Sequence, residues 1–155
     1  MKRILILSDT HNLLRPEVLA RAALADAILH AGDISTPSVL DELRALAPTH
    51  AVCGNNDKNW PSPLPDTLTV ELEGVRFFLV HNKKDVPSPL PDADVIVYGH
   101  SHRYSEQTRD GTLWLNPGSC GKRRFDQEIT FCELLADNGG CTIQKHTIPH
   151  PQRSL

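Results

Sequence analysis

Short apolar runs alternate with amphipathic stretches through the first third of the chain. Residues 4–7 form an uninterrupted apolar run that ends at polar residues, which is typical of a strand buried on both faces. Apolar residues at helical spacing follow Pro16 and again follow Pro37, and proline is favoured in the first turn of a helix. Residues 27–30 and 49–53 are two further short apolar runs. This order predicts a β-α-β-α-β unit with parallel strands.

The rest of the chain predicts strands and turns with little helix. The stretch from Trp60 to Asp66 is rich in proline and predicts a surface loop, and residues 82–93 hold three prolines and predict an exposed connection. Glycine-containing turns separate paired apolar runs, which predicts hairpins. The predicted strands are residues 67–72, 75–80, 95–98, 105–108, 112–115, 129–135 and 142–148.

Length and composition favour one compact domain. The chain has 155 residues, of which 39% are hydrophobic and 23% charged, close to the average of globular proteins. We expect a single domain over residues 1–149, followed by a flexible tail at residues 150–155. The formal net charge of -3 argues against a broad basic face for nucleic acid.

The cysteines and the amino terminus point to a reducing compartment. Four cysteines show no CxxC pair, so neither a zinc ribbon nor a disulfide framework is indicated. Only four apolar residues follow Met1-Lys2-Arg3, too few for a signal peptide, and no run approaches the roughly 18 apolar residues of a membrane span. We expect a cytoplasmic protein without a membrane segment.

Side chains that bind divalent cations gather where the predicted strands end. The carboxyl ends of parallel strands meet at one edge of a sheet, so these side chains should lie close together. Carboxylates, amide oxygens and neutral imidazoles are all competent ligands. If one carboxylate bridges, seven donors divide into two sets of four, which suits two ions about 3.5 to 4 Å apart. The seven are Asp9, His11, Asp33, Asn55, His81, His100 and His102.

Five sequence blocks, in the order "SDTH", "HAGD", "GNND", "VH" and "GHSH", are followed by "NPGS". Between residue 4 and about residue 120 the chain resembles the calcineurin-like metallophosphoesterases, and among them the small single-domain bacterial and archaeal phosphodiesterases. The resemblance implies an α/β four-layer sandwich, in which two mixed β sheets are flanked by helices.

The resemblance also implies a ligand set and a reaction. Asp9, His11 and His102 would bind the first ion, Asp33 would bridge, and Asn55, His81 and His100 would bind the second. A hydroxide held between the ions would attack a phosphodiester in line. We therefore expect catalysis to depend on Asp33, Asn55 and His81. The mixture of oxygen and imidazole ligands favours Mn²⁺, with Fe, Zn, Ni or Mg as alternatives.

Two positions depart from the pattern of many relatives. Asn56 stands where those relatives carry a histidine that protonates the leaving group, so we expect low rates unless the leaving group is already good. Asn82 stands where glycine usually follows the metal-binding histidine, which raises a question about the backbone of the second site.

Several smaller assignments stay open. Lys122-Arg123-Arg124 could meet a substrate phosphate or form a solvated loop, and Asn116 and Ser119 could line the rim of the site or simply form a turn. Asp57 is expected to orient Asn55 or its loop. A packed position for His30 is favoured over a supporting role at the site.

The expected substrate is a small phosphodiester or a nucleotide anhydride, with nucleic acid and membrane partners disfavoured and a homo-oligomer possible. The alternative is a non-catalytic interaction scaffold on the same fold, as in the scaffold subunit of retromer.

Overall fold

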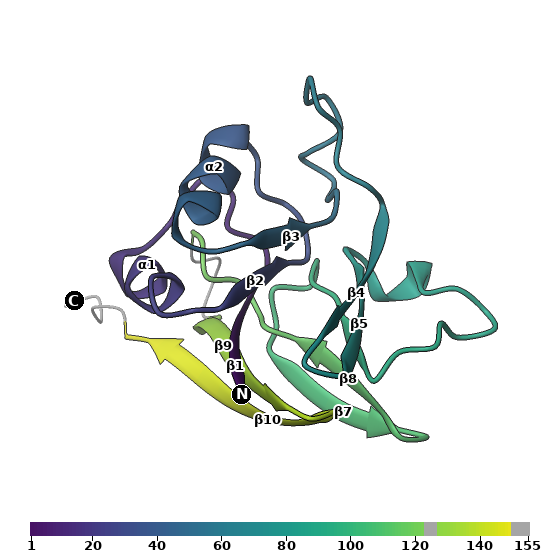
Figure 1. Ribbon diagram of the computed structural model, residues 1–155. Coiled ribbons are helices and arrows are strands. Elements are labelled where there is room, and N and C mark those ends of the chain that lie inside the picture. Colours follow the sequence, from purple (N-terminus) through teal and green to yellow (C-terminus); the bar gives the residue numbers. More distant parts are fainter. Residues whose placement is uncertain (123–126, 150–155) are drawn as a thin grey trace.

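The computed structural model describes residues 1–122 and 127–149 and arranges them around two mixed β sheets (Figure 1). Helix α1 is Pro16–Ala22, α2 is Pro37–Leu46, and the 3₁₀ helix η1 is Lys83–Asp85. The predicted tail at residues 150–155 lies outside the described residues. The strands are β1 (Lys2–Leu7), β2 (Ala27–His30), β3 (Thr49–Ala51), β4 (Thr67–Leu72), β5 (Val75–Val80), β6 (Val95–Val97), β7 (Ser105–Arg109), β8 (Thr112–Asn116), β9 (Ile129–Asp137) and β10 (Gly140–Ile148).

The first sheet has the order β10-β9-β1-β2-β3 and the second has the order β4-β5-β6-β8-β7. Strands β1, β2 and β3 run parallel, and so do β5, β6 and β8. The predicted β-α-β-α-β unit and the three hairpins are thereby confirmed. Each sheet therefore presents a set of parallel carboxyl ends, where the predicted ligands begin.

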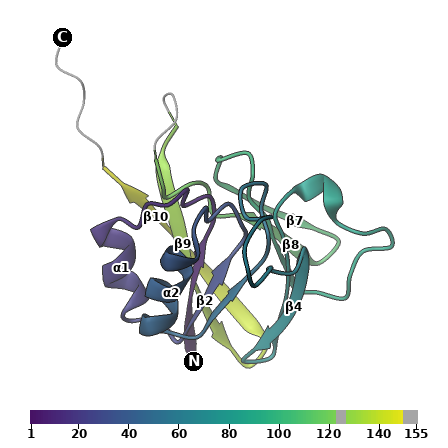
Figure 2. The same cartoon turned by 90° about the horizontal axis from the view of Figure 1, so that it is seen from above.

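Strand β1 is buried on both faces, as its apolar run predicted. Leu5 and Leu7 belong to a cluster with the helices, whereas Ile4 and Ile6 belong to a cluster between the two sheets. This alternation follows from the two-residue period of a strand. Figure 2 shows the resulting order, with the two helices on one side of the first sheet and the second sheet on the other.

Both helices begin at a proline, and an ion-pair cluster joins the first one to the sheet. Arg21 of α1 donates to the buried carboxylate of Glu133 on β9. Glu133 also lies 3.3 Å from Arg3 Nε and 3.0 Å from His146 Nε2. Three basic side chains therefore converge on one buried acid, which pairs with Leu5 within β1.

The outer face of the second sheet is covered by a loop rather than by helices. Val86 of the connection between β5 and β6 packs on a cluster of Phe78, Val80, Ala93, Ile96, Tyr98 and Trp114. Within the described residues, that connection contains only the one turn of η1, as its prolines predicted. The fold is the expected sandwich of two mixed sheets, but the helical flank implied by the resemblance is present on one side only.

In the described part of the chain, none of the helices combines the length and the apolar character needed to cross a membrane.

Candidate metal centre

The ends of five strands bring the predicted ligands together. Six of the seven fall into two groups in which the ligand atoms lie within 4.8 Å of one another. We call Asp9, His11 and His102 the first group, and Asp33, His81 and His100 the second group. The first group comes from the loops after β1 and β6, and the second from the loops after β2, β5 and β6.

In the first group, one carboxylate oxygen is held by the protein and the other faces imidazoles. Asp9 Oδ2 accepts hydrogen bonds from the Ser8 hydroxyl at 2.7 Å and from the His100 backbone N–H at 3.0 Å. Asp9 Oδ1 is buried without a hydrogen-bond partner and lies 3.4 Å from His102 Nε2 and 3.7 Å from His11 Nε2. A buried oxygen without a donor is costly, and a bound cation would satisfy it.

In the second group, the tautomer of His81 is fixed by the backbone. His81 Nδ1 lies 2.8 Å from the carbonyl oxygen of Ala31, which can only accept, so Nδ1 carries the proton. In the neutral ring, His81 Nε2 therefore carries the lone pair, and it points at Asp33 Oδ2 at 3.2 Å without another hydrogen-bond partner. This arrangement is the usual way in which proteins orient a ligating histidine.

Asp33 stands where the two groups meet. Its Oδ2 atom lies 3.2 Å from His81 Nε2 in the second group and 3.8 Å from His11 Nε2 in the first. Its Oδ1 atom accepts from the backbone N–H of Asn56 at 3.0 Å, which fixes the carboxylate plane. Asp9 Oδ1 also lies near the second group, 4.0 Å from His81 Nε2. Two carboxylates and imidazole lone pairs facing one space fit divalent cations.

The electrostatics of the groups favour ionised carboxylates. Burial opposes ionisation of Asp9, but His102, His11 and Ser8 outweigh it and lower the pKa of Asp9. Burial also opposes ionisation of Asp33, and His81 together with the Asn56 N–H lowers its pKa. For His81 burial disfavours the charged ring, yet Asp33 and Asp9 raise its pKa. Protons and cations therefore compete for His81, so cation binding should weaken at acid pH.

Five of the seven residues adopt left-handed backbone angles. Such angles are unfavourable for residues other than glycine and persist only where surrounding contacts enforce them. Here the loops brace one another, since the Asp9 N–H donates to Gly32 O and the His11 N–H donates to Asp33 O, both at 3.0 Å. The φ values are 54° at Asp9, 44° at His11, 60° at Asp33, 73° at His100 and 64° at His102.

Asp57 positions the loop that carries Asp33. Its carboxylate is buried and accepts backbone N–H groups from two separate loops, so its role reaches beyond the loop of Asn55 that the sequence indicated. Only the three-dimensional approach of the two loops shows this wider role. The donors are Asp33 at 2.8 Å, Ile34 at 3.0 Å, Ser35 at 2.8 Å and Gly54 at 2.9 Å.

The "NPGS" block lies beneath the site rather than at its rim. Asn116 is buried and donates through Nδ2 to Gly99 O at 3.2 Å, and to the Ser101 hydroxyl at 3.1 Å. Ser119 is also buried, and its hydroxyl donates to Asp9 O at 2.9 Å. The two side chains thus tie together the loops that follow β1 and β6.

His30 is packed, as expected, and it also supports the site. Its Nδ1 accepts the Gly32 N–H at 3.0 Å, so the ring proton sits on Nε2 and is directed at the Thr10 hydroxyl at 3.1 Å. Complete burial lowers the pKa of His30 to about 4, which keeps the ring neutral at physiological pH. A neutral His30 adds no positive charge beneath the carboxylates.

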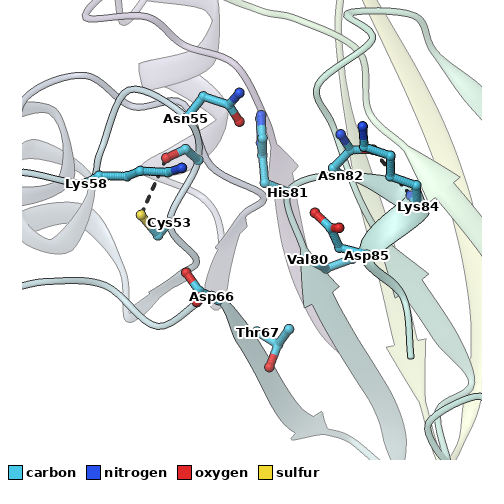
Figure 3. A pocket seen from close by; sticks show the side chains of 11 residues that line it. Cys53, Asn55, Lys58, Asp66, Thr67, Val80, His81, Asn82, Lys84 and Asp85 are labelled. Carbon is cyan, nitrogen blue, oxygen red and sulfur yellow. Dashed lines mark hydrogen bonds between the residues drawn. The ribbon is translucent and has the colours of Figure 1, made fainter. Parts of the chain in front are cut away.

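The three asparagines singled out by the sequence occupy different settings. Asn55 is exposed and lines the same pocket as His81 (Figure 3). The side-chain amide nitrogen of Asn56 lies 3.2 Å from His11 Nδ1, so Asn56 touches the first group. Asn82 has φ -113°, an ordinary extended angle, and its side chain accepts from the Lys84 N–H at 3.2 Å. A glycine is therefore not needed at position 82.

The basic run after the "NPGS" block is only partly described. Lys122 is exposed, whereas Arg123 and Arg124 lie outside the described residues. Their contact with substrate stays a prediction.

Comparison with known proteins agrees with this geometry. The family model of the calcineurin-like phosphoesterase superfamily domain matches residues 1–139. A probable metallophosphoesterase of Methanothermobacter thermautotrophicus is 31% identical over 128 residues, and the match covers 74% of this chain and 74% of the relative. A protein named as a phosphodiesterase from Methanocaldococcus jannaschii is 30% identical over 139 residues, covering 76% of this chain and 84% of the relative.

Solved structures share the fold. An archaeal phosphodiesterase superposes with a TM-score of 0.71 at 25% identity, covering 94% of this chain and 99% of its own. Vacuolar protein sorting 29 of Cryptosporidium parvum superposes with a TM-score of 0.76 at 17% identity, covering 96% of this chain and 98% of its own, which shows the common fold alone. The match to the family model over most of the chain, together with the relatives at 30% identity or more, shows that this chain belongs to the calcineurin-like phosphoesterase superfamily.

Proposed function

We propose that this chain is a phosphodiesterase that works with two divalent metal ions. The observation that carries the proposal is the meeting of the two ligand groups at Asp33, where Asp9 Oδ1 and His81 Nε2 are buried and lack a hydrogen-bond partner. Membership of the superfamily and the relative named as a phosphodiesterase support the same reaction class.

The proposed ligands divide as the groups do. Asp9, His11 and His102 would hold one ion, His81, His100 and Asn55 would hold the other, and the Asp33 carboxylate would serve both. When bound, the ions would acidify the attacking water and would supply positive charge for the phosphoryl oxygens. We favour Mn²⁺ over Fe, Zn, Ni or Mg, because oxygen and imidazole donors are mixed.

The chain itself orients the donors and keeps the two carboxylates ionised. The Ala31 carbonyl holds the His81 proton on Nδ1, and the Asn56 N–H and the Asp57 carboxylate hold Asp33 and its loop. Asp33 and Asp9 stay ionised because their pKa values are lowered. Preorganised donors of this kind avoid rearrangement during the reaction.

No proton donor stands at position 56. The Asn56 amide contacts His11 and does not donate a proton usefully at neutral pH, so the leaving group must depart without that help. We therefore propose small phosphodiesters with good leaving groups, or nucleotide anhydrides, as substrates. The net charge of -3 disfavours a nucleic acid polymer.

The test is hydrolysis of bis-p-nitrophenyl phosphate and p-nitrophenyl phosphate by metal-stripped protein, before and after Mn²⁺ is added, with bound metal counted in the same samples. We expect diester hydrolysis to rise as occupancy approaches two ions per chain, and to exceed monoester hydrolysis. Two bound ions without turnover, or no binding of metal, would refute the proposed enzymatic activity. Either result would favour the alternative, an interaction scaffold on the phosphoesterase fold.

A further inference from the structure

A pocket of about 510 Å³ opens beside the second group. Cys53, Asn55 and Lys58 line it from the segment after β3, and Asn82, Lys84 and Asp85 line it from the segment after β5. His81 and Asn55, two of the proposed ligands, form the wall nearest the metal centre (Figure 3). A group attached to a phosphorus atom at the centre can therefore extend into this pocket.

The charges of the pocket come from opposite walls. Lys58 reaches in from the segment after β3, and Asp85 faces the same space from η1 (Figure 3). Lys84 and Asp66 complete the charged lining. Within residues 1–122 and 127–149, none of these four side chains forms an ion pair, so their charges are available to a ligand.

The uncharged lining narrows the class of ligand. Val80 is the one branched aliphatic side chain of the described lining, and that lining includes no Phe, Tyr or Trp for a base to stack on, although the His81 ring forms part of it. Two ammonium groups suit an anion, and two carboxylates and the Asn82 amide suit hydroxyl groups, because each carboxylate oxygen accepts hydrogen bonds.

We propose that this pocket binds the leaving group of the substrate, and that the preferred leaving group is a hydroxylated, sugar-like group carrying a second phosphate. Lys58 and Lys84 contact that second phosphate, and Asp66 and Asp85 accept from hydroxyls. This inference rests on the proposed phosphodiesterase, whose reacting phosphate lies at the two ligand groups. The volume suits such a group, since small-molecule pockets range from about 300 to 1,000 Å³.

The experiment compares two probes on the Mn²⁺-loaded full chain by calorimetry. Adenosine 3′,5′-bisphosphate offers a second phosphate on a hydroxylated ring, and adenosine 5′-monophosphate lacks it. We expect the unmodified protein to bind the bisphosphate at least about tenfold more tightly, and Lys58→Ala and Lys84→Ala each to reduce that ratio about fivefold, as for exposed ion pairs. The matched control is Lys2→Ala, which removes the same charge at the opposite end of β1 and should keep the ratio.

Equal affinity for the two probes would overturn the inference. An equal fall of the affinity ratio in all three variants would overturn it too, because the preference would then come from the overall charge of the protein. Bis-p-nitrophenyl phosphate hydrolysis, measured in parallel, tests the proposed function separately. If hydrolysis is absent while the affinity ratio and its dependence on Lys58 and Lys84 persist, the pocket assignment is supported and the phosphodiesterase proposal is refuted. If hydrolysis is present and the affinity ratio is one, the pocket assignment is refuted and the phosphodiesterase proposal is supported.

Discussion

The two ligand groups differ in how deeply the fold encloses them. In the first group, Asp9 and His102 are buried and His11 is half-buried. In the second group, Asp33 and His81 are buried, but His100 is exposed, and Asn55 is exposed as well. An ion in the first group would therefore be bound tightly and exchange slowly, whereas an ion in the second group would face the pocket and the incoming substrate.

The difference follows from where the donors originate. The first group depends on two loops that are tied together directly, since the His100 N–H donates to Asp9 and the Ser119 hydroxyl donates to the Asp9 backbone. Both groups take donors from both sheets, but the second draws on three loops, those after β2, β5 and β6. The second group therefore has one more loop to hold in place, and its geometry depends on more contacts between loops.

Removing the shared carboxylate should abolish the distinction between the groups. We expect Asp33→Ala to reduce diester turnover by about 10³-fold or more, because several kcal/mol of charge stabilisation is lost, and to lower metal occupancy in both groups. Asp33→Gly, which tolerates the left-handed backbone at this position, should behave alike. Turnover and bound metal are measured together, with Asp41→Ala as the control on the surface of α2. Normal turnover with two ions in Asp33→Ala would show that Asp33 does not bridge.

Loosening the loop of Asp33 should damage the second group more than the first. Asp57→Asn replaces one acceptor oxygen with a donor that faces backbone N–H groups, so we expect a loss of about 2 to 4 kcal/mol in the free energy of unfolding. Metal affinity of the second group should fall about 10- to 100-fold, as for other residues that orient ligands. Denaturant unfolding and metal titration test both expectations. An equal loss of affinity in the two groups would contradict this role.

Single histidine deletions compare the groups directly. We expect His102→Ala and His100→Ala each to lower the stoichiometry from two tightly bound ions towards one. The remaining ion should bind about tenfold more weakly in His102→Ala than in His100→Ala, because His102→Ala damages the enclosed group. Competition with a chromophoric chelator measures both constants. If the ion kept by His100→Ala is the weaker of the two, our ranking of the groups is wrong.

Supplying a proton donor at position 56 should change the leaving-group preference. We expect Asn56→His to raise turnover several-fold on alkyl phosphodiesters and less on aryl phosphodiesters, because only poor leaving groups need protonation. Asn56→Gln, which has no acidic proton, is the control. Equal gains on both classes of substrate would indicate that the new side chain acts through its contact with His11 instead.

Glu133 offers a comparison outside both groups. Burial opposes its ionisation, but Arg21, His146 and Arg3 lower its pKa below the usual 4.5. The lowered pKa stabilises the fold above that usual value, and this contribution is lost as pH falls through the folded-state pKa. We expect Glu133→Gln to cost about 2 kcal/mol at pH 7 and progressively less below pH 4.5, with turnover within about twofold of the unmodified protein. A stability difference that is independent of pH would refute the ion-pair explanation.

The sequence predicted the strands well, because they are short-range patterns, and six of the seven side chains that it singled out lie in two groups. The apolar run of residues 4–7 predicts a buried strand, and the polar residues that follow it predict a site at the end of that strand. The full reach of Asp57, and the buried positions of Asn116 and Ser119, could not be predicted, because they depend on loops that meet only in the fold. Ser119, for example, donates to Asp9, 110 residues earlier in the chain.

At Asn82 the sequence suggested a backbone constraint that the structure does not have. The usual glycine at that position suggested a backbone constraint, yet the chain passes His81 in an extended conformation that any residue adopts. Sequence comparison alone does not separate a glycine that is required from one that is merely common. The structure identifies a required one at Gly99, where an added Cβ would lie 1.9 Å from the Ser8 hydroxyl oxygen.

The loop that covers the second sheet has a consequence for ligand exchange. It buries the smallest of the three apolar clusters among the described residues, so the free energy needed to lift it locally should be lower than for the rest of the core. Lys84 and Asp85 belong to this loop, whereas most of the proposed ligands do not. We expect this wall of the pocket to open locally more readily than the loops that carry the buried carboxylates. Amide hydrogens of residues 85 and 86 should then exchange with solvent well before that of Gly99.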